Sequence, residues 1–166
     1  VELSAVYDAL LAALPPTDHP LAAANIKPRL RMTALYYLAQ ARHALVLGSG
    51  NRSEIMVGYA TKWGDAGADL MPLGGLYKTQ VWVLARHLGV PRAVIERPPS
   101  AGLWPGQTDE AEMGIRYHDL DRVLAAIDGG DTSAIEPDLL QRVETMIAHS
   151  AHKRALPPIF EPTGSA

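Results

Sequence analysis

The sequence contains no cysteine, and this absence excludes several kinds of chemistry at once. Without thiols the 166-residue chain has no disulfide framework, no thiolate metal site and no cysteine nucleophile. It also lacks any apolar run close to the roughly 20 residues that a membrane span requires. Its first residues do not show the basic stretch followed by an apolar one that marks a signal peptide. These absences predict a cytoplasmic protein with no membrane partner.

Neither sign of charge dominates the composition. The 15 basic and 18 acidic residues leave a formal net charge of −3, so no broad basic surface favours a nucleic-acid partner. An anionic ligand would have to meet cationic side chains clustered at one place. Hydrophobic residues make up 48% of the chain, which is enough for one core and predicts a single domain over residues 1–166. Residues 162–166 form a short Pro/Gly/Ser tail.

Apolar residues recur at helical spacing in several segments. The expected helices are residues 3–14, 25–42, 53–59, 77–88, 117–127 and 137–149. Residues 44–47 form a short apolar run that ends in Gly-Ser-Gly, which indicates a buried parallel strand. Strand and helix alternating with glycine turns predict an α/β fold, a partial doubly wound parallel sheet flanked by helices. Only one or two strands are visible, so the N-terminal strands of such a sheet are expected to be missing from this sequence.

The turn after the expected strand, Gly48-Ser49-Gly50-Asn51-Arg52-Ser53-Glu54, has features of a phosphate and metal site. Its glycines let the backbone approach a phosphate, and the helix N-terminus that follows favours anions. Ser49 offers a hydroxyl, and Glu54 is a carboxylate of the kind that Mg²⁺ takes together with substrate phosphates. The same residues also fit an ordinary helix start, with Ser53 as the cap and Glu54 in the first turn. The turn matches neither the Walker A nor the dinucleotide fingerprint.

The next polar segment, residues 61–69, places Lys62, Asp65 and Asp69 among glycines. An exposed polar loop is the simplest interpretation. Apolar residues on either side nevertheless suggest that the loop lies against the core, where charges are more often functional. Lys78 begins the following helix, where the macrodipole favours anions, so a phosphate bound there would account for the lysine.

Two further segments could bind a ligand. Residues 98–106 contain three prolines and two glycines, which restrict the loop to few conformations, and Ser100 could place its hydroxyl on a phosphate or metal. Alternatively, Trp104 fills the core and residues 108–110 cap a helix. The cationic triplet 152–154 either stabilises a helix end or grips the phosphates of a dinucleotide.

Six segments together resemble the ammonia-dependent NAD synthetases. They are residues 25–32, 48–54, 59–69, 76–82, 98–110 and 152–154, and the likeness runs from about Asn25 to Pro158. The ATP-pyrophosphatase superfamily, which includes GMP and asparagine synthetases, shares the fold of this family but not this set of motifs.

The resemblance implies a ligase that forms a carbon–nitrogen bond. Members of the family adenylate the carboxylate of deamido-NAD (nicotinic acid adenine dinucleotide) with ATP; ammonia then displaces AMP. The resemblance implies ATP contacts for Ser49, Lys78 and Ser100, an Mg²⁺ ligand in Glu54, a role in the ammonia step for Asp65, a substrate-side role for Asn25, and deamido-NAD contacts for Arg29, Lys62, Asp69, His152 and Lys153. It also implies a homodimer. Because glutamine-dependent relatives need a cysteine nucleophile, free ammonia is the expected nitrogen donor.

One motif of the family does not occur in this sequence. The Ser-Gly-Gly-x-Asp-Ser phosphate loop lies upstream of the Asn25 motif in relatives, and it supplies a second Mg²⁺ carboxylate. The chain is therefore expected to be the C-terminal part of a NAD synthetase domain, carrying half of an ATP site. Two functions remain open at this point. The chain is either a NAD synthetase or a truncated, non-catalytic nucleotide-binding fragment or partner subunit of a split synthetase.

Overall fold

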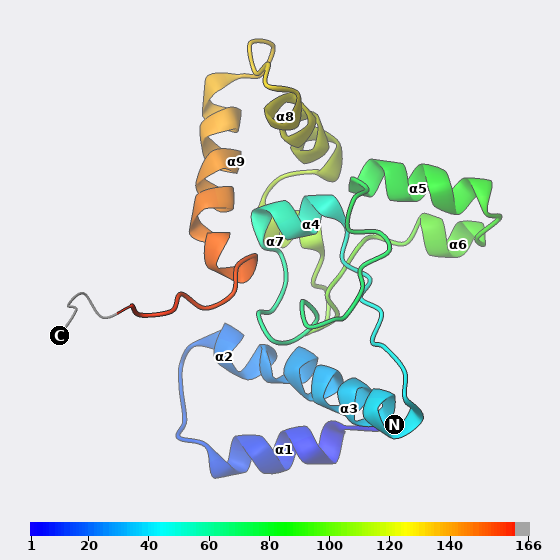
Figure 1. Ribbon diagram of the computed structural model, residues 1–166, viewed down its shortest axis with the longest axis vertical. Coiled ribbons are helices and arrows are strands. Elements are labelled where there is room, and N and C mark those ends of the chain that lie inside the picture. The colour runs from blue at the N-terminus through cyan, green and yellow to red at the C-terminus, as the bar shows by residue number, and fades with distance from the viewer. Residues whose placement is uncertain (162–166) are drawn as a thin grey trace.

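The computed structural model describes residues 1–161, and the predicted tail at 162–166 lies outside them (Figure 1). The regular elements of the described part are α1 (Ser4–Ala13), α2 (Pro20–Ala24), α3 (Ile26–Arg42), α4 (Arg52–Val57), α5 (Lys78–His87), α6 (Arg92–Ile95), α7 (Asp109–Met113), α8 (Tyr117–Gly129), α9 (Pro137–His149) and the 3₁₀ helix η1 (Ala151–Lys153). All six predicted helices are confirmed to within two residues at each end. The elements that the periodicity missed are short, because three to five residues cannot show a 3.6-residue repeat.

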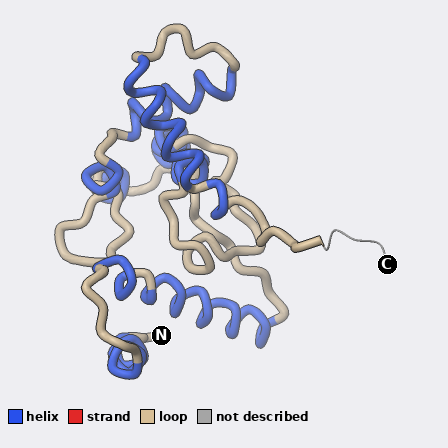
Figure 2. Tube along the Cα trace, turned by 90° about the vertical axis from the view of Figure 1, so that its left-hand side faces the viewer, coloured by secondary structure: helices blue, strands red, loops and turns tan. Residues whose placement is uncertain are grey.

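The expected buried strand at residues 44–47 does not form as a strand. Among residues 1–161 the pairing is limited to one isolated parallel bridge between Leu47 and Leu70, and Figure 2 shows helices and loops alone. Val46 is buried, but Leu45 and Leu47 are 71% and 63% exposed. A strand is stabilised by neighbours on its edges and faces, and this segment has a neighbour on one edge only. The parallel sheet is therefore not confirmed, and the described part of the chain is helical.

The hydrophobic core is built around α8. Tyr117, Leu120, Val123 and Leu124 are fully buried on one side of this helix, as expected for an amphipathic helix whose apolar stripe faces the interior. Val57 at the end of α4 and Val143 of α9 complete the cluster with Met113, Ile115 and Ile135. No residue of α1 is buried. Among the described residues, no helix is long and apolar enough to cross a bilayer.

Helices α1 and α3 form one end of the molecule, and α4, α8 and α9 form the other (Figure 1). Lys27 of α3 is tied to the loop that precedes α7, because its ammonium donates to the Leu103 carbonyl over 2.6 Å. The junction between the two parts is where the polar segments predicted from the sequence converge.

Gly58 ends α4 where the chain passes α9 at close range. It has a φ of +67°, and a Cβ built on it would lie 2.1 Å from the Cβ of Ser150. Gly89 has a similar φ of +70° with no atom within 4 Å of its Cβ position. The two glycines share the left-handed backbone and differ only in what surrounds them.

We therefore expect Gly89→Ala to cost about 1 kcal/mol of unfolding free energy, from backbone strain alone. Gly58→Ala should cost at least about 2 kcal/mol more, because the α4–α9 contact must open. Urea unfolding of both variants measures the difference. Equal losses of unfolding free energy would show that α4 and α9 can move apart to admit the Cβ at no energetic cost.

Candidate active site

A cavity of about 700 Å³ lies between the two parts of the molecule. Its walls come from α2 and α3, the turn after Leu47, residues 58–65, the first turns of α5, and the loop before α7. Among the residues predicted from the sequence, it brings together Asn25, Ser49, Glu54, Asp65, Lys78, Ser100 and Lys153. The fold thus gathers segments from both ends of the described chain.

The other predicted residues lie outside the cavity wall. Arg29 donates to the carbonyl of Lys62 over 3.3 Å, and the Lys62 ammonium donates to the carbonyl of His152. Arg29, Lys62 and His152 thus form a chain of contacts. Asp69 accepts from the Val46 amide over 2.8 Å and from the Tyr36 hydroxyl over 3.1 Å, which holds the isolated bridge in place. Their contacts with a dinucleotide stay predictions.

Lys78 and Glu54 form an ion pair in the cavity wall. The ammonium lies 3.2 Å from Glu54 Oε1, and each side chain is only 17% exposed. Glu54 Oε2 accepts from the amide of Asn51, whose side chain accepts from the Glu54 amide over 3.0 Å. This is a capping box, so Glu54 caps the helix start with one oxygen and pairs with Lys78 through the other. Asn51, rather than the expected Ser53, is the cap.

A buried polar network positions Lys78. Ser53 Oγ is fully buried, donates to Asp121 Oδ1 over 2.5 Å and accepts from the Lys78 amide over 2.9 Å. Asp121 Oδ2 accepts from the Thr79 amide over 2.8 Å. The first amides of a helix have no partner within the helix, and here Ser53 and Asp121 supply acceptors for two of them. The network joins α4, α5 and α8 and determines where the Lys78 side chain begins.

The hydroxyl of Tyr117 lies between two carboxylates. It is 2.9 Å from Asp109 Oδ2 and 3.2 Å from Glu54 Oε1, and its ring packs edge-on against Trp82. Burial, followed by the charges of Glu54 and Asp109, raises the pKa of Tyr117 far above its usual range. Asp109 is 5% exposed, and its Oδ1 is buried without a hydrogen-bond partner.

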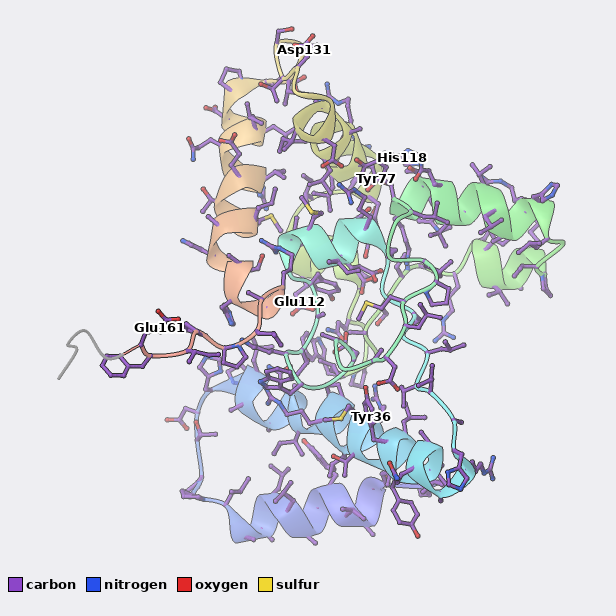
Figure 3. All side chains as sticks on the ribbon, in the orientation of Figure 1. Tyr36, Tyr77, Glu112, His118, Asp131 and Glu161 are labelled. Carbon is purple, nitrogen blue, oxygen red and sulfur yellow. The ribbon has the colours of Figure 1, made fainter. Side chains whose placement is uncertain are left out.

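The loop expected to bind a ligand is held by side chains rather than by its prolines alone. The Gln107 side chain accepts from the Leu103 amide over 2.8 Å and donates to Glu112 over 2.7 Å; Figure 3 shows Glu112 near the centre of the molecule. Trp104 is 41% exposed, so the expectation that it fills the core is wrong; Leu103 is buried instead. The expected helix cap is confirmed, since Thr108 caps α7.

Lys153 and Arg154 of the cationic triplet contact backbone carbonyls chiefly at the end of α4, whereas the simpler interpretation placed the triplet at the solvated end of the helix that precedes it. Lys153 donates to the carbonyls of Gly58 and Ala60, both over 2.7 Å, and Arg154 donates to the carbonyl of Met56 over 2.6 Å. These carbonyls lie at and just beyond the end of α4, where backbone acceptors lack helical partners. Burial lowers the pKa of Lys153, and the charge of Asp65 opposes this shift. Lys153 also lines the cavity, so a ligand contact remains open to it.

Charges of both signs line the cavity. Its cationic side chains are Arg31, Lys78, Arg97 and Lys153, and its acidic ones are Glu54, Asp65, Asp109 and Glu112. Within residues 1–161, no three His, Asp or Glu side chains gather into a group that could hold a metal on its own. Mg²⁺ needs only one or two carboxylates when phosphates supply the remaining ligands. Glu54, a carboxylate in the cavity wall, fits that requirement.

Sequence reasoning missed three buried residues of this site: Asp109, Tyr117 and Asp121. One signal was available for Asp121. Tyr117, Leu120 and Leu124 place it on the apolar stripe of α8, where a carboxylate is expected to have a partner. No comparable signal distinguished Asp109 from an ordinary residue in a helix's first turn.

Comparison with known proteins identifies close relatives. A family model described as NAD synthase matches residues 1–157. The NH(3)-dependent NAD(+) synthetase of Archaeoglobus fulgidus is 53% identical over 139 residues, which cover 84% of this chain and 56% of the relative. That of Carboxydothermus hydrogenoformans is 50% identical over 163 residues, covering 96% and 65%. The chain therefore spans about half to two thirds of the length of these curated relatives.

Solved structures show the same likeness. NMN synthetase from Francisella tularensis superimposes with a TM-score of 0.85 at 36% identity, covering 99% of this chain and 66% of that one. NH3-dependent NAD synthetase from Campylobacter jejuni, in complex with the nitrate ion, superimposes with a TM-score of 0.80 at 26% identity, covering 97% and 64%.

The buried network predicts unequal roles for two aspartates of α8. Asp121→Asn keeps the side-chain shape but leaves one oxygen to serve two donors, so we expect a loss of about 1–3 kcal/mol of unfolding free energy. Asp128 pairs with Arg52 near the surface. Asp128→Asn should therefore cost less than about 1 kcal/mol. Chemical denaturation of both variants tests this, and equal losses would contradict the positioning role of Asp121.

Tyr117 predicts a dependence of stability on alkaline pH. Its folded pKa is raised above the unfolded value of about 10, so the stability it confers is complete below pH 10 and is lost as the pH rises further. One proton corresponds to about 1.4 kcal/mol per pH unit. Between pH 10 and 11.5, the unfolding free energy of the wild type should fall more steeply with pH than that of Tyr117→Phe. The difference between the two slopes should approach about 1.4 kcal/mol per pH unit. Equal slopes in urea unfolding would contradict the prediction.

Proposed function

Because the chain belongs to the NAD synthase family, we propose that it catalyses the ATP-dependent amidation of deamido-NAD to NAD with ammonia. The carboxylate is first adenylated with release of pyrophosphate, and ammonia then displaces AMP. On this proposal the protein is a cytoplasmic ligase that forms a carbon–nitrogen bond and acts as a homodimer.

One observation supports the proposal most strongly. The ion pair of Lys78 and Glu54 lies in the wall of a cavity of about 700 Å³ and is held in place by a buried network. This volume lies within the usual range of small-molecule sites, roughly 300–1,000 Å³. A fixed ammonium beside a fixed carboxylate suits a substrate that carries phosphates and a divalent cation.

The first step must bring two anions together, the carboxylate of deamido-NAD and the triphosphate of ATP. Lys78 would offset their repulsion and stabilise the charge that builds on the leaving pyrophosphate. Ser49 and Ser100 line the same cavity and would donate their hydroxyls to ATP. Mg²⁺, when bound through Glu54 and phosphate oxygens, would supply further charge neutralisation.

The second step needs a group that handles ammonia. Asp65 Oδ1 accepts from the Thr61 amide over 2.8 Å, which orients the carboxylate at the cavity wall. We propose that Asp65 holds ammonium and accepts a proton as ammonia attacks. Asn25 and Lys153 line the cavity and would contact deamido-NAD, while Arg29, Lys62, Asp69 and His152 would bind its more distant parts.

The neighbour named NMN synthetase supports a second substrate class. A mononucleotide carrying the same nicotinic acid carboxylate would require the same adenylation and the same attack by ammonia. The assay should therefore offer the acid mononucleotide beside deamido-NAD, with ATP, Mg²⁺ and ammonia present. Amide formation from the mononucleotide alone would replace the proposed substrate while preserving the reaction.

Replacing Lys78 by alanine should lower kcat/KM for NAD formation by roughly 10²-fold or more, because the fixed ammonium that stabilises the transition state is lost. Glu54→Ala should have an effect of similar size through the metal. Arg92→Ala is a matched control, because it removes an ion pair with Glu96 at the surface, where the Arg92 side chain is 87% exposed. The intact mass of each purified variant should be measured first, so that the activity is assigned to the 166-residue chain.

A loss of less than a few-fold in Lys78→Ala would contradict the catalytic role. A wild-type protein that binds ATP but forms no amide from either substrate would favour the non-catalytic nucleotide-binding interpretation.

A further inference from the structure

The hydroxyl of Tyr117 has one proton and faces two carboxylates. Asp109 Oδ2 is at 2.9 Å and Glu54 Oε1 is at 3.2 Å, so the hydroxyl can donate to only one of them at a time. Which carboxylate receives this proton determines how freely Glu54 can bind a cation.

Asp109 has the greater need for a donor. It is 5% exposed, its Oδ1 has no hydrogen-bond partner, and its Oδ2 accepts from the Tyr117 hydroxyl. The Tyr59 hydroxyl also lies near Asp109, but it donates to Glu112 over 2.7 Å. A buried carboxylate without a donor is costly. Both oxygens of Glu54 already accept hydrogen bonds, Oε1 from the Lys78 ammonium and Oε2 from the Asn51 amide. The shorter distance and the greater need both direct the proton towards Asp109.

We propose that Asp109 is a positioning residue that holds the Tyr117 proton away from Glu54, so that this proton does not compete with a cation for Glu54 Oε1. This inference rests on the proposed role of Glu54 in Mg²⁺ binding. In the structure Lys78 occupies that oxygen, and a divalent cation would take its place once a phosphate draws the ammonium away. Without the charge of Asp109, the hydroxyl turns to Glu54, because a carboxylate accepts a hydrogen bond more strongly than a neutral amide.

The inference predicts an unusual order among three variants. Asp109→Asn should weaken Mn²⁺ binding, used as a probe for Mg²⁺, about tenfold or more, because the Tyr117 hydroxyl then competes for Glu54 Oε1. Tyr117→Phe should leave the affinity within about threefold of the wild type. The double variant Asp109→Asn/Tyr117→Phe should recover most of the affinity that Asp109→Asn loses, because the competing proton is gone. The part that it does not recover measures the lost charge of Asp109 in the cavity wall.

The measurement is Mn²⁺ titration by electron paramagnetic resonance, with a non-hydrolysable ATP analogue present and with the folded state of each variant checked by circular dichroism. Tyr77→Phe is the matched control: its hydroxyl also donates to a carboxylate, Asp128, at the α5–α8 junction outside the cavity (Figure 3). Its Mn²⁺ affinity should not change.

Three outcomes would overturn the inference. If the double variant binds Mn²⁺ as poorly as Asp109→Asn, Asp109 does not act through Tyr117. If Tyr117→Phe alone loses tenfold, the hydroxyl supports Glu54 rather than competing with it. Absence of Mn²⁺ binding to the wild type would also refute the inference. Because the readout is metal binding, a protein that binds Mn²⁺ but forms no NAD would disprove the proposed function and leave this inference standing.

Discussion

The buried carboxylate of Asp121 determines where α5 begins and therefore where Lys78 lies. Asp121 belongs to the central helix α8, accepts from the Ser53 hydroxyl of α4 and accepts from the Thr79 amide in the first turn of α5, while Ser53 accepts from the Lys78 amide. A buried charge requires donors, and these donors come from separate segments, so the network ties α4, α5 and α8 together. The ion pair of Lys78 with Glu54 follows from that arrangement, because both residues stand next to members of the network.

The site combines structural and chemical roles in the same residues. Glu54 closes the capping box of α4 with one oxygen and pairs with Lys78 in the cavity wall through the other. Lys153 holds the carbonyls beyond α4 while lining the same cavity. The competing interpretations of these motifs, helix capping and ligand binding, are therefore compatible. A residue held by the backbone has few accessible conformations, which is what a pre-organised site requires.

The sequence predicted the long helices well and the sheet poorly. α9 was predicted to the residue because a proline and an amphipathic repeat mark it over 13 residues. The apolar run 44–47 resembled a buried strand, yet Leu45 and Leu47 are exposed and the pairing is a single bridge. Local composition reports the tendency of a segment to be extended, but a strand also requires partners. The neighbouring strands that would pair with residues 44–47 are distant in sequence, so local composition does not report whether they are present.

The sequence by itself determined the family motifs, the absence of thiol chemistry and the residue types of the candidate site, because each depends on side-chain identity or spacing along the chain. Only the tertiary structure decided which of those residues share a cavity: seven predicted residues line it, whereas Arg29, Lys62, Asp69 and His152 do not. It alone revealed that Tyr117 stands between Glu54 and Asp109. The reason is physical, since a hydrogen bond depends on a few tenths of an ångström between atoms that are distant in sequence, and packing sets those distances.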